Sequence, residues 1–178
     1  MKTLIFSIAL VLSTLGTNLS AQRTIFSEKH GSTLNLGLGI GGYSSYYDNI
    51  GHTLPVFAIN YEIGIARNFT LAPFLTLYSY TDGNYRELVT PIGVKGTVYL
   101  DQLLRAGSNW DFYVAGSLGV ALVNTTWDAD YYGDRLYYQS TSPLYLDFHV
   151  GTEYRLSNSL GIFLDLSSGV STIGLAIH

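Results

Sequence analysis

Hydrophobic and polar residues alternate one by one in eight short segments of this chain. In the first of them every second residue from Leu34 to Ile40 is Leu or Ile, and the residues between are Asn or Gly. A period of two predicts β-strands, because successive side chains of a strand point to opposite faces of its sheet. The predicted strands are Thr33–Tyr43, Leu54–Ile65, Phe69–Tyr80, Leu88–Leu100, Phe112–Val123, Leu144–Tyr154, Leu160–Ser167 and Val170–Ile177.

The composition of the two faces indicates which solvent each one meets. The apolar face carries no charged residue in any of these segments, and the opposite face is rich in Gly, Ala, Ser and Thr rather than Lys and Glu. A basic residue facing lipid at the membrane midplane costs about 2–4 kcal/mol. Charged residues make up 12% of the chain, well below the roughly 25–35% typical of a soluble domain's surface. The pattern predicts an all-β, eight-stranded, antiparallel, up-and-down transmembrane β-barrel with lipid outside.

The start of the chain has the composition of a secretory leader. Lys2 precedes an apolar run from Leu4 to Leu12, and small residues follow up to Ala21. This pattern predicts a signal peptide at residues 1–21, cleaved after Ala21. Residues 22–32 are then expected to form a periplasmic N-terminal tail, and residues 33–178 the barrel.

Net charge and cysteine content exclude some binding partners and some covalent modifications. The formal charge of −4 argues against nucleic-acid binding, which needs a basic face. The chain has no cysteine, so neither disulfides nor a lipoprotein anchor is expected.

The predicted connections differ in length between the two ends of the barrel. Those at Ala66–Asn68, Asp101–Asp111 and Arg155–Ser159 fall at one end, and the longer ones at Tyr43–Thr53, Tyr80–Glu87 and Asn124–Pro143 fall at the other. Short turns are typical of the periplasmic side of such barrels and long loops of the exterior. Pro73 and Pro91 interrupt adjacent strands, and a β-bulge is expected at each because proline has no N–H to donate.

With this leader, these eight strands and hairpins such as Val150–Leu160, the chain resembles the small eight-stranded outer-membrane barrels of Gram-negative bacteria. That group comprises the OmpA-type transmembrane domain and the outer-membrane β-barrel domain family. The resemblance implies a place in the outer membrane among its lipids and lipopolysaccharide, and insertion by the barrel-assembly machinery. Members typically end in a lipid-facing aromatic residue, whereas this sequence ends in His178, which has the inward phase.

Six ionisable residues have the phase of the barrel interior. An eight-stranded barrel has room inside for side chains only, and charges there must pair or form hydrogen bonds. The expected role is a polar network that fills and braces the lumen, with a gated proton or ion path as the alternative. The residues are Glu62, Lys95, Asp147, His149, Glu153 and Asp165.

No catalytic, cofactor or metal site is predicted. His149 with Asp147 or Glu153 could act as a base and its orienting carboxylate, but the sequence places no serine beside His149 and contains no G-x-S-x-G. Gly37–Gly42 spells G-x-G-x-x-G, but no helix follows to hold a pyrophosphate.

An acidic and aromatic loop lies between the fifth and sixth strands. It begins like a calcium loop, but Tyr132 occupies the third ligand position. Tyr and Trp provide binding area at low entropic cost, so this loop is a candidate extracellular recognition surface. Its residues are Trp127, Asp128, Asp130, Tyr131, Tyr132, Asp134, Arg135, Tyr137 and Tyr138.

The resulting functional hypothesis is a non-enzymatic outer-membrane barrel with a structural or surface-display and adhesion role, whose loops bind an external protein or glycan. Three alternatives stay open: a narrow, porin-like channel for ions or small solutes, a lipid-modifying outer-membrane enzyme, and a periplasmic lipocalin-like ligand binder.

Overall fold

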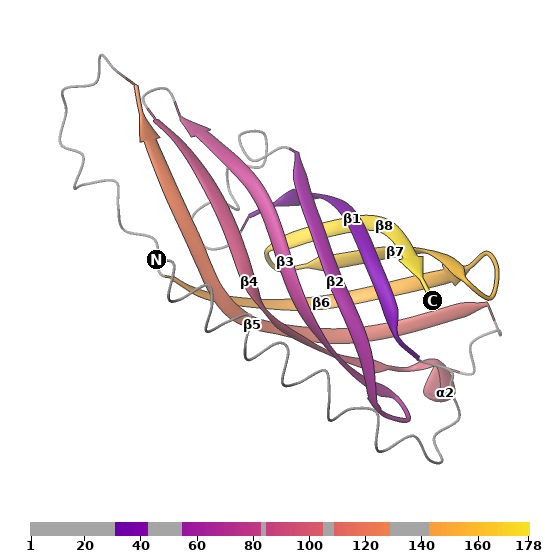
Figure 1. Ribbon diagram of the computed structural model, residues 1–178. Helices are drawn as coiled ribbons and strands as arrows, with labels where there is room; N and C mark the ends of the chain where they lie inside the picture. Colours follow the sequence, from indigo (N-terminus) through magenta and orange to yellow (C-terminus); the bar gives the residue numbers. More distant parts are fainter. Residues whose placement is uncertain (1–30, 43–54, 83–84, 105–108, 129–142) are drawn as a thin grey trace.

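The computed structural model describes residues 31–42, 55–82, 85–104, 109–128 and 143–178, and these ranges form a single β-barrel (Figure 1). The signal peptide predicted at residues 1–21 lies outside the described residues, as does most of the predicted N-terminal tail. The elements are β1 (Thr33–Gly41), β2 (Val56–Ala66), β3 (Phe69–Asp82), β4 (Tyr85–Tyr99), α2 (Asp101–Leu104), β5 (Trp110–Trp127), β6 (Leu144–Arg155), β7 (Leu160–Ser167) and β8 (Val170–Ile177).

The eight strands close on themselves. Each strand pairs antiparallel with the next one in sequence, and β1 pairs with β8 through positions such as Leu34↔Ile177. Closure gives both sides of every strand a neighbour, which removes the exposed edges of an open sheet. The predicted eight-stranded up-and-down barrel is thereby confirmed.

The two ends of the barrel differ. We call the end with the β2–β3 and β6–β7 turns and α2 the α2 end, and the opposite end, which has the β1–β2 and β5–β6 connections, the loop end. β3, β4 and β5 have 14, 15 and 18 residues, whereas β7 and β8 have 8 each. The wall formed by β3–β5 therefore extends further at the loop end than the β7–β8 side (Figure 1).

This extension corrects two predicted connections. The predicted long loop Tyr80–Glu87 is instead a hairpin, in which β3 continues to Asp82 and β4 starts at Tyr85, with Thr81↔Arg86 paired. β5 continues to Trp127, so the predicted loop from Asn124 begins four residues later in the structure. In both places strand pairing persists after the apolar alternation has ended.

The expected bulges at the two prolines are wrong. Pairing of β3 with β4 stops at Leu75↔Ile92 and resumes at Tyr78↔Val89 in the same register, with Pro91 between. Pairing of β2 with β3 likewise stops and resumes unshifted around Pro73. A missing N–H thus interrupts the ladder without an extra residue, and the register shift lies at Gly64/Ala66, beside the β2–β3 turn.

The outer surface of the barrel is an apolar belt. Most of the outward side chains predicted from the alternation are exposed, among them Leu118 at 59%, Val150 at 64% and Phe148 at 73%. An exposed apolar surface this continuous is a membrane-contacting surface rather than one that faces water. Beyond the belt, the outward residues of the β3–β5 extension are polar: Thr81, Arg86, Asn124 and Thr126.

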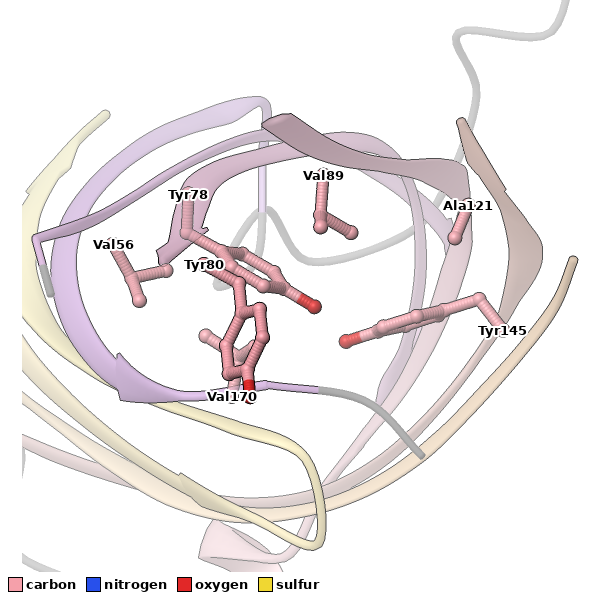
Figure 2. Close-up of a cluster of buried hydrophobic side chains, with 7 residues drawn as sticks. All are labelled: Val56, Tyr78, Tyr80, Val89, Ala121, Tyr145 and Val170. Carbon is pink, nitrogen blue, oxygen red and sulfur yellow. The ribbon is translucent and has the colours of Figure 1, made fainter. Parts of the chain in front are cut away.

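The loop end of the lumen is filled by a cluster that we call the plug. Its buried side chains come from six strands and point toward the barrel axis (Figure 2). Three tyrosines supply most of its bulk, and Phe74, Tyr85 and Val123 pack against it. The plug consists of Val56, Tyr78, Tyr80, Val89, Ala121, Tyr145 and Val170.

At the other end, α2 is a single turn that follows β4. The buried carboxylate of Asp101 accepts a hydrogen bond from the backbone N–H of Phe112 at 2.8 Å, which ties this turn to β5. Among the described residues, no helix is both long enough and apolar enough to cross a membrane.

Candidate functional site

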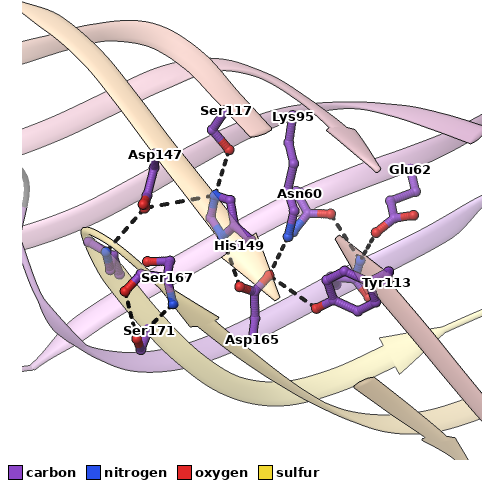
Figure 3. Close-up of polar contacts among 12 residues, drawn as sticks. Asn60, Glu62, Lys95, Tyr113, Ser117, Asp147, His149, Asp165, Ser167 and Ser171 are labelled. Atoms are coloured by element: carbon purple, nitrogen blue, oxygen red, sulfur yellow. Dashed lines mark hydrogen bonds and ion pairs between the residues drawn. The ribbon is translucent and has the colours of Figure 1, made fainter. Parts of the chain in front are cut away.

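Below the plug, the lumen holds a group of polar side chains that the four strands β4–β7 bring together (Figure 3). The register places Lys95 on β4 opposite Ser117 on β5, and Ser117 opposite Asp147 on β6. His149 lies two residues further along β6, on the same inward face. These residues are therefore neighbours although they are up to 54 positions apart in the sequence.

Asp165 on β7 is the centre of this group. Its carboxylate forms an ion pair with Lys95, and its Oδ1 lies 2.8 Å from His149 Nδ1. The hydroxyl of Tyr113 also donates to Asp165 Oδ2, at 3.1 Å. All four side chains are buried, so the carboxylate exchanges its hydration for one cation and two further hydrogen-bond partners.

A glycine allows Tyr113 to reach Asp165. The register places Tyr113 on β5 opposite Gly151 on β6, and Gly151 opposite Asp165 on β7. A Cβ on Gly151 would overlap the Tyr113 ring. The absent side chain therefore leaves the space in which the tyrosine crosses one strand to bind the carboxylate on the next.

His149 connects Asp165 to Ser117. Its Nδ1 faces the carboxylate, and its Nε2 lies 2.8 Å from the Ser117 hydroxyl oxygen. A carboxylate can only accept, so in the neutral imidazole the proton is on Nδ1, and Nε2 accepts from the hydroxyl of Ser117. The expectation that no serine lies beside His149 is therefore wrong.

Asp147 fixes the β7–β8 turn. Its carboxylate accepts hydrogen bonds from the backbone N–H groups of Gly169 at 2.8 Å and Val170 at 3.2 Å, and from the Ser168 hydroxyl at 2.7 Å. The Tyr145 hydroxyl of the plug donates to it at 2.9 Å. These four donors stabilise the charge without a paired cation, although His149 Nε2 lies 3.8 Å away.

Glu62 forms a second polar group, nearer the α2 end. It accepts hydrogen bonds from Asn35 at 3.0 Å, from Thr70 at 2.8 Å and from Tyr99 at 2.7 Å. Glu62, Thr70 and Tyr99 are buried on β2, β3 and β4. Neutral amide and hydroxyl donors thus stabilise this carboxylate.

Glu153 belongs to a third group. Its Oε1 lies 2.7 Å from Nε2 of His178, and Nδ1 of His178 lies 3.0 Å from the Thr33 hydroxyl. A Cβ on the neighbouring Gly161 would overlap the Glu153 carboxylate. Glu153 therefore lies across Gly161, much as Tyr113 lies across Gly151.

The structure places all six predicted lumen residues in the interior, but in separate groups. Lys95, Asp147, His149 and Asp165 come together, whereas Glu62 and Glu153 each have their own partners. Sequence reasoning missed Ser117, Tyr113, Tyr145, Asn35 and His178 as partners. Their inward phase was visible, but their contacts depend on the register between strands.

The predicted recognition loop is described only at its start. Trp127 is the last residue of β5, with its ring 5.1 Å from that of Tyr85, and Asp128 follows it, exposed. The remaining residues of the loop, 129–138, lie outside the described residues.

A small cavity of about 40 Å³ lies in the lumen beside the His149 group. Ser117, His149, Asp165, Lys95 and Asn60 line it, together with Tyr145 of the plug. Across the described ranges, no three His, Cys, Asp or Glu side chains are grouped so that they could hold a metal ion.

Among the comparisons with known proteins, only the one with solved structures bears on the fold. No protein-family model and no curated protein matches the chain. A solved structure from the de novo design of transmembrane β-barrels matches with a TM-score of 0.52 and 11% identity, over 86% of this chain and 98% of that one. This likeness shows that the chain shares the architecture of a transmembrane β-barrel.

Two structures of the outer-membrane protein Ail of Yersinia pestis are also similar. The structure of Ail in a phospholipid bilayer nanodisc has a TM-score of 0.44 at 11% identity, covering 83% of this chain and 99% of Ail. Ail in complex with the heparin analogue sucrose octasulfate has a TM-score of 0.45 at 9% identity, covering 82% and 95%.

Proposed function

We propose that this protein is an outer-membrane barrel with a sealed lumen, which anchors and presents the loop end of the chain to an external protein or glycan. The observation that carries this proposal is the combination of an apolar outer belt with an interior that side chains fill except for one small cavity. Such a molecule is held by lipid on its outside and offers no wide path through its inside.

Three groups of side chains, stacked along the barrel axis, support a sealed lumen. The plug fills the loop end, the group around Asp165 fills the middle, and the group around Glu62 fills the part nearer the α2 end. The cavity of about 40 Å³ beside His149 has room for only a few water molecules. Conduction of ions or solutes would therefore require side chains in more than one group to move.

The shape of the loop end supports a display role. The outward face of the β3–β5 wall changes from apolar at Leu122 to polar at Asn124 and Thr126, as expected where a strand leaves the hydrocarbon layer. The rings of Tyr80, Tyr85 and Trp127 are in contact at this position, with centroids 5.1 to 6.1 Å apart. The acidic and aromatic segment 128–143 thus starts from a rigid aromatic base outside the membrane.

The location can be tested by membrane fractionation combined with a heat-modifiability gel. We expect the protein to resist extraction with high salt, to need detergent, and to migrate differently before and after boiling because the closed barrel withstands unheated detergent. A periplasmic lipocalin-like protein would appear in the salt wash, and that result would contradict the proposal.

The display role can be tested by replacing residues 131–138 with a Gly/Ser segment of equal length, which leaves the barrel unchanged. Cells that carry the protein are exposed to a panel of immobilised glycans and extracellular proteins. We expect the replacement to remove binding that the parent chain confers. Equal binding by both would refute display through this loop.

The sealed lumen can be tested in planar lipid bilayers. We expect no stepwise conductance from the parent protein. A steady conductance that changes in Lys95→Ala would instead support the narrow-channel alternative.

A further inference from the structure

We propose that Ser117, His149 and Asp165 form a nucleophile, base and carboxylate triad inside the lumen, which transfers small acyl groups from esters. This inference goes beyond anchoring and display, and does not depend on either. It follows from the order of contacts in Figure 3, where the serine and the carboxylate bind opposite nitrogens of one imidazole.

The geometry meets the requirements of an activated serine. The Ser117 oxygen is 2.8 Å from Nε2, and Asp165 Oδ1 is 2.8 Å from Nδ1. A base within hydrogen-bond reach of the nucleophile, itself oriented by a third group, is the arrangement that raises the nucleophilicity of a hydroxyl. The three residues are on β5, β6 and β7, which are rigidly paired strands.

Neighbouring groups leave this arrangement intact. Lys95 forms an ion pair with Asp165, so the carboxylate has a countercharge where it faces the imidazole. Asp147 lies 3.8 Å from Nε2, further than Ser117, and its oxygens already accept from the β7–β8 turn and Tyr145. The hydroxyl of Ser117 is therefore the nearest partner of Nε2.

Serines at the nearby β7–β8 hairpin provide a contrast. The Ser168 hydroxyl donates to Asp147, and the Ser171 hydroxyl lies 3.5 Å from the carbonyl oxygen of Ser167. Neither contact supplies a base with an orienting carboxylate. We therefore expect Ser117, although it is buried, to react faster than Ser171, which is more exposed.

The cavity determines the substrate class. Ser117, His149 and Asp165 line the space of about 40 Å³, and Lys95 and Asn60 line it as well. An acetyl-sized acyl group can replace the few waters that such a volume holds. The Lys95 ammonium supplies positive charge in the same space, where negative charge develops on the acyl oxygen during attack. The expected substrates are small, uncharged esters.

The reaction balances without a further reactant except water. The Ser117 oxygen bonds to the acyl carbon while its proton moves to His149 Nε2, and the bond from the acyl carbon to the ester oxygen breaks. The leaving alkoxide takes the proton from His149 and departs as an alcohol. Water, deprotonated by the same imidazole, then cleaves the acyl-serine to a carboxylic acid and regenerates the hydroxyl.

Labelling with methanesulfonyl fluoride tests the triad in the folded protein in detergent micelles. The serine oxygen bonds to sulfur, the S–F bond breaks, fluoride leaves, and the serine proton passes to the imidazole. Peptide mapping by mass spectrometry should find the methanesulfonyl group on Ser117, with Ser171 in the same chain unmodified. Ser117→Ala should abolish the labelling, and His149→Asn should slow it about 100-fold or more, the range of general-base assistance.

Separate controls test whether the reagent can reach Ser117 and whether each variant folds. Tyr80→Ala removes the tyrosine of the plug with the greatest exposure, and it should speed labelling of Ser117 if the plug limits entry. Each variant is first checked by its heat-modifiability shift. If His149→Asn does not form the barrel, the rates of Ser117 and Ser171 within the parent chain decide instead. The proposal is overturned if Ser117 reacts no faster than Ser171 in both the parent and Tyr80→Ala proteins.

The labelling experiment and the tests of the proposed function have independent outcomes. An unreactive Ser117 would leave a sealed display barrel unaffected. Loss of binding after loop replacement would say nothing about the triad.

Discussion

The imidazole Nε2 of His178 lies 2.7 Å from Oε1 of Glu153, and its Nδ1 lies 3.0 Å from the Thr33 hydroxyl. Thr33 opens β1, His178 follows β8, and Glu153 is on β6. One side chain thus joins three strands at the α2 end, where β1 and β8 close the barrel. The inward phase of His178 therefore gives this residue a structural role where β1 and β8 meet.

His178→Ala should destabilise the barrel by about 1–3 kcal/mol, since it leaves the buried carboxylate of Glu153 without its partner. Urea unfolding from lipid vesicles, followed by the fluorescence of Trp110 and Trp127, measures the change. Ser159→Ala, an exposed substitution in the β6–β7 turn, is the control and should leave the midpoint unchanged. Equal midpoints for both variants would show that the three-strand contact contributes nothing.

Asp147→Ala should destabilise the barrel by about 3 kcal/mol, because hydrogen bonds to charged groups contribute about 1.5–3 kcal/mol each and are not additive. Asp147→Asn keeps an acceptor oxygen, so its free energy of unfolding should lie between those of the parent and Asp147→Ala. Urea unfolding gives the order. Hydrogen exchange should also show faster exchange at the N–H groups of Gly169 and Val170 in Asp147→Ala.

The matched control is Asp128→Ala, since Asp128 is exposed beyond the end of β5. It removes the same charge and should change the stability little. If Asp147→Ala were no less stable than this control, Asp147 would not be what holds the β7–β8 turn.

The fold could be predicted from the sequence because a barrel in lipid separates its two faces completely. Each outward position, such as Leu118 or Phe148, must be apolar, and each neighbour points into the lumen. The rule applies only within the hydrocarbon layer. Where β3 and β4 continue past this layer, outward residues such as Thr81 and Arg86 are polar. The alternation of apolar and polar residues therefore ends there, although the two strands stay paired up to the hairpin turn.

The contacts of the site could be predicted only in part. Phase places His149 and Asp165 inside, but Ser117 meets His149 only because of the register between β5 and β6. Tyr113 meets Asp165 because Gly151 leaves space on the strand between them. Pairing in a lumen depends on register and on the size of intervening residues, and neither can be read from a single strand.

Leu118→Arg should destabilise the barrel by about 2–4 kcal/mol, the cost of a basic side chain that faces lipid near the midplane. Leu156→Arg, in the β6–β7 turn, should cost about 1 kcal/mol or less, because a charge near the interface reaches water. Both leucines are exposed, at 59% and 54%, so a water-soluble barrel would tolerate the two changes alike. Unfolding in vesicles distinguishes these outcomes, and equal small effects would contradict a lipid-facing belt.

Lys95→Met should destabilise the barrel by about 3–5 kcal/mol, because it leaves Asp165 as a buried charge with its cation removed. The double variant Lys95→Met, Asp165→Asn should recover part of this loss, since it removes both charges. Arg155→Met provides the contrast: its partner Asp111 is buried, but the Arg155 side chain is 23% exposed against 7% for Lys95. Water can replace the more exposed cation, so we expect a smaller loss than for Lys95→Met. Urea unfolding of the parent, Lys95→Met, Asp165→Asn and the double variant gives the coupling directly. A double variant as unstable as the sum of the two single changes would show that Lys95 and Asp165 do not stabilise each other.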